Sequence, residues 1–213
     1  MLHKEAIQPS TLELLEKLQS VDILKDFHLA GGTSLALQIG HRLSIDLDLF
    51  TQNDFDVNAL LEFLEDKFQF ALNFSSNNTL KGSIGDVSID FISHKYPLVT
   101  DILVENSVRL YAMPDIAAMK LNAIAGNGTR VKDFIDVYFI LKHYSLNDII
   151  GFYGTKYTKR NLLHAIKSLN YFDDINSVDF PKMILEKNLS LAKVKKTIAA
   201  QVKILSGKLS DEF

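Results

Sequence analysis

The sequence contains no cysteine, which excludes disulfide bonds, thiolate metal sites and cysteine nucleophiles. It has no apolar run that approaches the roughly 18 residues of a membrane-spanning helix. The first residues carry no apolar signal-peptide core, and internal repeats and low-complexity tracts are absent. We therefore expect a cytoplasmic protein with no membrane segment.

The chain is long enough for a packed core, with 213 residues and a hydrophobic fraction of 47%. Its net charge of −3 is unevenly distributed. Residues 1–150 contain 12 Lys and Arg against 20 Asp and Glu, whereas residues 151–213 contain 11 against 6. An acidic first part could bind metal ions, and a basic last part could bind a polyanion such as a nucleic acid. An excess of lysine arises more often from a solvated helix surface.

One stretch, from Leu29 to Phe50, concentrates the signals that point to chemistry. The glycine pair Gly31-Gly32 follows a short apolar run and precedes a hydroxyl pair, Thr33-Ser34, at the start of an apolar helix. A strand, a glycine turn and a helix start bring free backbone N–H groups and the positive helix end to one point. That arrangement favours the binding of a phosphate.

Two carboxylates follow on the next predicted strand. Because side chains alternate across a strand, Asp46 and Asp48 are expected on one face, and Ile45, Leu47 and Leu49 on the other. Neighbouring carboxylates repel each other unless a cation lies between them. A phosphate site beside a site for a divalent ion is what a nucleoside triphosphate with Mg²⁺ requires.

Periodicity and turn signals predict an α+β fold with a small mixed or antiparallel sheet flanked by helices and followed by a helical C-terminal part. A capping box at Ser10 and Glu13 is expected to open the first helix. The predicted helices are 10–25, 33–39, 57–67, 114–126, 130–144, 146–153, 158–168, 181–187 and 190–206, and the predicted strands are 27–30, 45–50, 68–74, 79–84, 87–93 and 109–112. We expect two parts. Residues 1–112 form a core, and residues 113–213 form a helical region that completes the site.

A third carboxylate, Asp90, lies near the centre of the strand predicted at 87–93. It is expected on the face opposite Val87, Ile89 and Phe91, where burial of a lone carboxylate would be costly. A role beside Asp46 and Asp48 around a metal ion would explain its position. An aspartate that faces water at a strand edge explains it equally well.

Further charged residues lie on the two helices that follow. Lys120 lies on the helix predicted at 114–126, while Asp133 and Asp136 lie three residues apart on the helix predicted at 130–144. Taken singly, Lys120 is most simply a solvated lysine, and Asp133 is most simply a capping residue or the partner of Arg130.

In combination, these residues resemble a known family. The stretch GGTSLALQIGHRLSIDLDLF, together with MKLNAIAGNGTRVKDFIDVYFIL downstream, is similar to the AbiEii/AbiGii group of nucleotidyltransferase toxins, within the DNA polymerase β-like nucleotidyltransferase superfamily. The matched blocks are residues 28–50 and 113–141, with the Asp90 strand between them. The C-terminal third carries no matched motif.

The resemblance implies a role for each matched residue. The nucleotide-binding set is Gly31, Gly32, Thr33, Ser34, Arg42 and Lys120; the metal-binding set is Asp46, Asp48 and Asp90; and the catalytic set is Asp46, Asp48, Asp90, Lys120 and Asp133, with Asp136 as the next acid of the second motif. Asp90 would act as base toward the attacking hydroxyl. The superfamily tolerates loss of this third acid.

The implied reaction transfers a nucleoside monophosphate from a nucleoside triphosphate to an acceptor hydroxyl, with Mg²⁺ or Mn²⁺ as cofactor. The resemblance implies RNA, such as a tRNA 3′ end, as acceptor, and a cognate antitoxin as partner. Two alternatives stay open: a module of the same fold that binds nucleotide without turnover, and a transferase that modifies a small molecule in the manner of antibiotic-modifying relatives.

Overall fold

A computed structural model of the protein describes residues 1–210, with side chains up to residue 207. The chain folds into two compact units. The first comprises Met1–Tyr96 and Asp101–Ala112, and the second comprises Pro97–Thr100 and the chain from Met113 onward. Each unit is described by itself.

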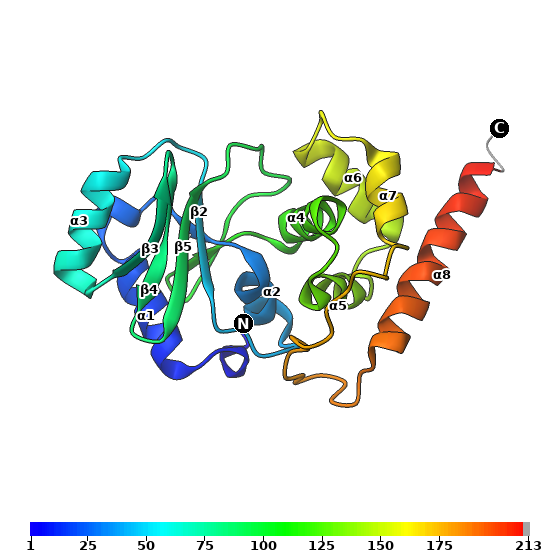
Figure 1. Cartoon of the computed structure of the whole chain (residues 1–213), viewed down its shortest axis with the longest axis horizontal. Coiled ribbons are helices and arrows are strands. Elements are labelled where there is room, and N and C mark those ends of the chain that lie inside the picture. Colours follow the sequence, from blue (N-terminus) through cyan, green and yellow to red (C-terminus); the bar gives the residue numbers. More distant parts are fainter. Residues whose placement is uncertain (211–213) are drawn as a thin grey trace. The chain divides into compact units, whose positions relative to one another are not determined.

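The first unit is built on a mixed sheet whose strand order is β3-β4-β5-β2-β1-β7-β6, and Figure 1 labels β2 to β5 of this sheet. Its strands are β1 His28–Leu29, β2 Leu47–Thr51, β3 Ala71–Ser76, β4 Thr79–Ile84, β5 Val87–Ser93, β6 Leu103–Glu105 and β7 Val108–Leu110. Its helices are η1 Lys4–Ala6, α1 Pro9–Gln19, η2 Asp22–Leu24, α2 Gly31–Ile39 and α3 Val57–Phe68. The α+β class predicted from the sequence is confirmed.

Strands β3, β4 and β5 form an antiparallel meander. Strand β2 then pairs with β5 in parallel and with β1 antiparallel. This pairing places β2, which follows the glycine turn, beside β5. The two strands that carry the predicted acids are therefore neighbours in the sheet.

The core of the first unit lies on one face of these strands. Leu47, Leu49, Ile89 and Phe91 alternate along β2 and β5 and are fully buried. Helix α3 packs against β3 and β4, as Figure 1 shows, and follows the cap residue Asp56, whose carboxylate accepts hydrogen bonds from two backbone N–H groups. Burial of the apolar face leaves the other face of β2 and β5 for polar side chains.

The second unit is helical in the part of the chain that the structure describes. Its helices are α4 Met113–Gly126, α5 Val131–Ile140, α6 Leu146–Lys156, α7 Leu162–Ser168 and α8 Leu191–Ser210. Helix α4 packs against α5, α6 and α7, and helix α8 packs against α5 and α6. None of the helices among residues 1–210 is long and apolar enough to cross a membrane.

A buried ion pair fixes the short segment Pro97–Thr100 within this second unit. Lys156 Nζ lies 2.7 Å from Asp115 Oδ1, and both side chains are fully buried. Asp115 also accepts the backbone N–H groups of Val99 and Thr100, and Lys156 donates to the carbonyl of Pro97. The pair compensates its own burial by satisfying backbone groups that would otherwise be unpaired.

A predicted helix and a predicted helix cap do not form, and one strand is additional to the prediction. Residues 181–187 form no helix, because Glu186 adopts a left-handed backbone conformation (φ 46°). The capping box at Ser10 does not form, since Pro9 starts α1 one residue earlier, after Gln8. Strand β6 was not predicted; it pairs with β7 across a tight turn whose central residues have positive φ.

Candidate functional site

The glycine turn joins β1 to α2 and lies directly against Asp48 on strand β2. Gly31 has a φ of 66°, and a β-carbon there would lie 1.9 Å from Oδ2 of Asp48. Only glycine accommodates both the backbone conformation and this approach. The Asp48 carboxylate is thereby placed at the N-terminal, positive end of α2.

The hydroxyl of Thr33 is buried and organises the loop before β2. Thr33 Oγ1 shares a 2.8 Å hydrogen bond with Ser44 Oγ and donates to the carbonyl of Asp46. Arg42, which is 3% exposed, donates to the carbonyl of Leu43 and to Ser44 Oγ. In this structure, the hydroxyl and the guanidinium therefore hold the segment that presents Asp46.

Ser34 connects helix α2 to Tyr111, the residue that follows strand β7. Its hydroxyl is fully buried and donates to the carbonyl of Tyr111 at 2.9 Å. Gln38, one helical turn later, donates to the same carbonyl at 2.9 Å. The half-buried Gly31 and Gly32 are thus the open part of the turn, while both hydroxyl side chains point inward.

Two of the three predicted acids lie on one face of the sheet, and the third lies outside it. Asp48 and Asp90 are direct partners in the parallel pairing of β2 and β5, and both are half-buried. Asp46 precedes β2 and is exposed. Ile45 was expected on the buried face, but it is 55% exposed because the strand begins only at Leu47.

Lys81, a residue that the sequence analysis missed, lies beside Asp90. It is the direct partner of Asp90 across β4 and β5, and its ammonium forms an ion pair with Oδ2 of Asp90. The sequence signal that could have identified this pair is the hairpin turn Gly85-Asp86. A two-residue turn between Ile84 and Val87 sets the register of both strands, and three pairs further along that register Lys81 faces Asp90.

The donor set fits a metal ion that arrives with a triphosphate. Within residues 1–210, no three His, Asp or Glu side chains gather closely enough to hold a metal ion by themselves. Asp46 and Asp48 offer two carboxylates, and the carboxylate of Asp90 is engaged by Lys81. Mg²⁺ is commonly held by one or two carboxylates together with substrate phosphates and water, which is what such a pair can supply.

The downstream motif forms a buried charge cluster in the second unit. Lys120 Nζ lies 2.7 Å from Asp133 Oδ1 and 2.7 Å from Asp136 Oδ2, and all three side chains are less than 10% exposed. Asp133 Oδ2 has no hydrogen-bond partner among the described residues, with Arg130 Nε 4.0 Å away. The structure thus brings the predicted Lys120 and Asp133 together, with Asp136 as a second acid on the same lysine.

Comparison with known proteins matches this chain to a family. Residues 13–193 match the model of the nucleotidyl transferase AbiEii toxin of type IV toxin–antitoxin systems. An uncharacterized protein of Aquifex aeolicus, aq_aa25, is 34% identical over 168 residues, which cover 76% of this chain and 81% of that protein.

Solved structures share the fold. A Helicobacter pylori protein assigned as a nucleotidyltransferase has a TM-score of 0.56 at 18% identity and covers 97% of this chain and 99% of its own. The antibiotic-resistance factor ANT(2″)-Ia has a TM-score of 0.52 at 11% identity and covers 68% of this chain and 90% of its own. At such identities the likeness is one of fold, and the predicted nucleotidyltransferase fold is confirmed.

Proposed function

Because the chain belongs to the AbiEii family of nucleotidyl transferase toxins, we propose that it transfers a nucleoside monophosphate from a nucleoside triphosphate to a hydroxyl of RNA. The observation that carries this proposal is the contact between the glycine turn and the acid pair: Asp48 lies against Gly31, at the positive end of α2. A phosphate bound at this turn would therefore lie beside the Asp48 carboxylate.

The chain's own residues divide the work between binding and proton transfer. The backbone N–H groups at Gly31 and Gly32 would bind phosphate oxygens, and the inward-pointing Thr33, Ser34 and Arg42 would keep this turn and Asp46 in place. Asp46 and Asp48 would hold Mg²⁺ or Mn²⁺, which would neutralise charge on the triphosphate when bound.

The transfer step exchanges one phosphorus–oxygen bond for another. The acceptor oxygen forms a bond to the α-phosphorus, the bond from that phosphorus to the bridging oxygen of the β-phosphate breaks, and pyrophosphate leaves. Asp90, the neighbour of Asp48 in the sheet, would take the proton of the attacking hydroxyl. Lys120 and Asp133 retain the phosphate-binding and catalytic roles that the family motif predicts.

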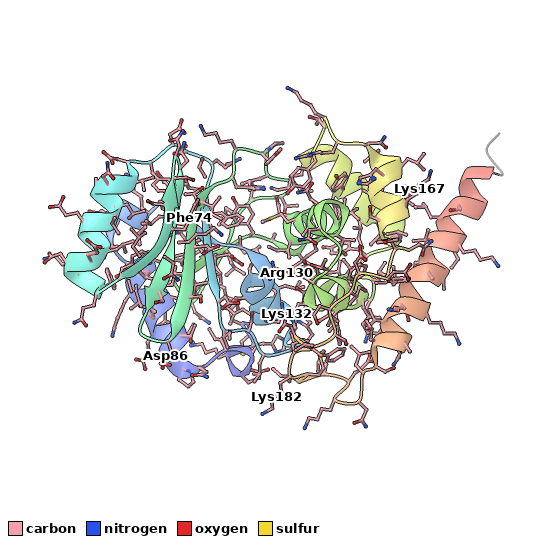
Figure 2. All side chains as sticks on the ribbon, in the orientation of Figure 1. Phe74, Asp86, Arg130, Lys132, Lys167 and Lys182 are labelled. Carbon is pink, nitrogen blue, oxygen red and sulfur yellow. The ribbon has the colours of Figure 1, made fainter. Side chains whose placement is uncertain are left out.

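RNA is the acceptor that the charge distribution favours. The excess of basic residues lies in residues 151–213, and Lys167 and Lys182 are exposed members of it, as Figure 2 shows. A polyanion gains affinity from such a surface. We further propose that the protein acts in the cytoplasm, where nucleoside triphosphates are abundant, and that a cognate antitoxin restrains it.

The experiment that tests the proposal is an unbiased labelling assay. The purified chain is incubated with each of the four α-labelled nucleoside triphosphates, Mg²⁺ and a bacterial lysate, and the labelled products are separated into RNA, protein and small molecules. Label in RNA is expected. Label confined to small molecules would favour the antibiotic-type alternative, and nucleotide binding without any labelled product would favour a regulatory module.

The toxin role has its own test. Expression of the chain in a bacterial host is expected to arrest growth, and the variant with both Asp46→Ala and Asp48→Ala is expected to leave growth unchanged at the same protein level. Growth arrest by both forms would contradict a toxic activity based on nucleotidyl transfer.

A further inference from the structure

We propose that Lys81 provides a built-in positive charge at Asp90, so that the site takes one divalent cation, at Asp46 and Asp48, rather than two. This inference rests on the proposed function and deepens it. It concerns Lys81, which lies outside the motif residues described above.

The register of three strands places the charges in one row. Lys81 on β4 is the partner of Asp90 on β5, and Asp90 is in turn the partner of Asp48 on β2. Adjacent strands are about 4.8 Å apart, so the row brings an ammonium and two carboxylates together on one face. The residues flanking Asp90 and Asp48 in sequence, Ile89 and Leu49 among them, are buried on the opposite face.

The row needs positive charge, and Lys81 supplies part of it. Two carboxylates on neighbouring strands repel each other. The ammonium of Lys81 is bound to Oδ2 of Asp90, with the side chains 39% and 27% exposed. Asp48 instead points toward Gly31 and the start of α2. Each carboxylate therefore faces its own source of positive charge, a lysine for Asp90 and a helix end for Asp48.

A second divalent ion is consequently disfavoured at Asp90. In a two-ion site the ions lie about 3.5–4 Å apart and need shared carboxylates. At Asp90 a second ion would have to displace the ammonium or accept a like charge beside it. Lys81 is thus a positioning residue: its ion pair holds the Asp90 carboxylate in place for the acceptor hydroxyl.

The test counts ions directly. Mn²⁺ is titrated into the full chain with one equivalent of a nucleoside triphosphate analogue that cannot be cleaved at its α-phosphorus, and free Mn²⁺ is measured by electron paramagnetic resonance. The wild-type chain is expected to bind one ion. Lys81→Met is expected to gain a second ion at the released Asp90 carboxylate, whereas Lys81→Met combined with Asp90→Asn is expected to return to one. Asp90→Asn by itself is expected to keep the single ion.

Two control variants separate this role from a general effect of lysine loss. Lys81→Arg retains the positive charge and is expected to bind one ion. Lys67→Met removes an exposed lysine that pairs with Asp66 in the same unit, and it is expected to match the wild-type chain. Circular dichroism melting of each variant reports whether it is folded.

The outcomes distinguish this inference from the proposed function. Two ions on a wild-type chain that transfers nucleotide would overturn the inference alone. Loss of the single ion in Asp90→Asn, or an unchanged count in Lys81→Met, would do the same. A wild-type chain that neither binds Mn²⁺ nor labels any acceptor would instead overturn the proposed function.

Discussion

A β-carbon at position 31 would lie 1.9 Å from Oδ2 of Asp48, so any side chain at position 31 would clash with the carboxylate of Asp48. This contact makes Gly31 part of the site through sterics as well as through its backbone conformation. It also explains how a turn and a strand that are 17 residues apart in sequence act as one unit.

Gly31→Ala is expected to abolish nucleotidyl transfer and to lower the free energy of unfolding by about 1–3 kcal/mol, because the left-handed conformation is strained and the methyl group displaces Asp48. Gly85→Ala is the matched control. Gly85 also has a positive φ (56°), but a β-carbon there meets no atom within 4 Å. We expect Gly85→Ala to cost stability only, by about 1 kcal/mol, with full activity. Equal activity in the two variants would contradict the role of the contact.

Thr33→Val is expected to lower the free energy of unfolding by about 1–3 kcal/mol and to reduce transfer, because the buried Ser44 hydroxyl and the Asp46 carbonyl lose their partner. Urea unfolding and the labelling assay measure the two effects. The exposed Thr158→Val serves as control and should change neither. A transfer rate that is unaffected in Thr33→Val would show that the loop presents Asp46 without this hydroxyl.

Lys156→Met is expected to destabilise the protein by about 3–5 kcal/mol, since it leaves the carboxylate of Asp115 buried without its charge partner. Lys156→Met combined with Asp115→Leu should recover part of the loss, because no unpaired charge remains. For comparison, breaking the exposed pair of Lys67 and Asp66 should change the free energy of unfolding far less, because solvent screens this pair. A similar, small cost for both pairs in denaturant unfolding would show that the buried pair is solvated.

Glu186 makes the stability of the second unit depend on pH in the acidic range. The ammonium groups of Lys142 and Lys193 and the hydroxyl of Tyr138 lower the pKa of Glu186 from 4.5 to about 2. Because this pKa is depressed in the folded state, the stabilisation is present above pH 4.5 and is lost as the pH falls toward 2.

Glu186→Gln is therefore expected to be less stable than the wild-type chain at pH 7, by about 1 kcal/mol after screening by solvent. The difference should shrink at acidic pH as the wild-type carboxylate becomes protonated. Chemical unfolding of both proteins across this pH range measures it. A difference that is the same at pH 7 and at the acid end would contradict the assignment.

Local patterns predicted the face on which the acids lie, because alternation along a strand is set by backbone geometry alone. The buried Leu47 and Leu49 and the opposed Asp48 follow that rule. The family resemblance, by contrast, supplied the roles assigned to these residues, which alternation does not distinguish from those of a surface aspartate.

Long-range pairing was not predictable in the same way. The parallel pairing of β2 with β5, which makes Asp48 and Asp90 neighbours, joins segments about 40 residues apart, and no local signal encodes it. The ion pair of Lys81 with Asp90 depends on register within one hairpin and could have been derived from its turn. The predicted helix at 181–187 failed because tertiary contacts of Glu186 override a local helical preference.

The most direct test of the account is nucleotidyl transfer by Asp48→Ala beside Asp86→Ala. Asp86 is an exposed aspartate at the β4–β5 turn of the same unit, as Figure 2 shows, and it controls for loss of a carboxylate. With an α-labelled nucleoside triphosphate, Mg²⁺ and cellular RNA, we expect Asp86→Ala to label RNA as the wild-type chain does and Asp48→Ala to give no label while remaining folded. Wild-type labelling by Asp48→Ala would contradict the central claim that Asp48 is part of a metal-dependent transfer site.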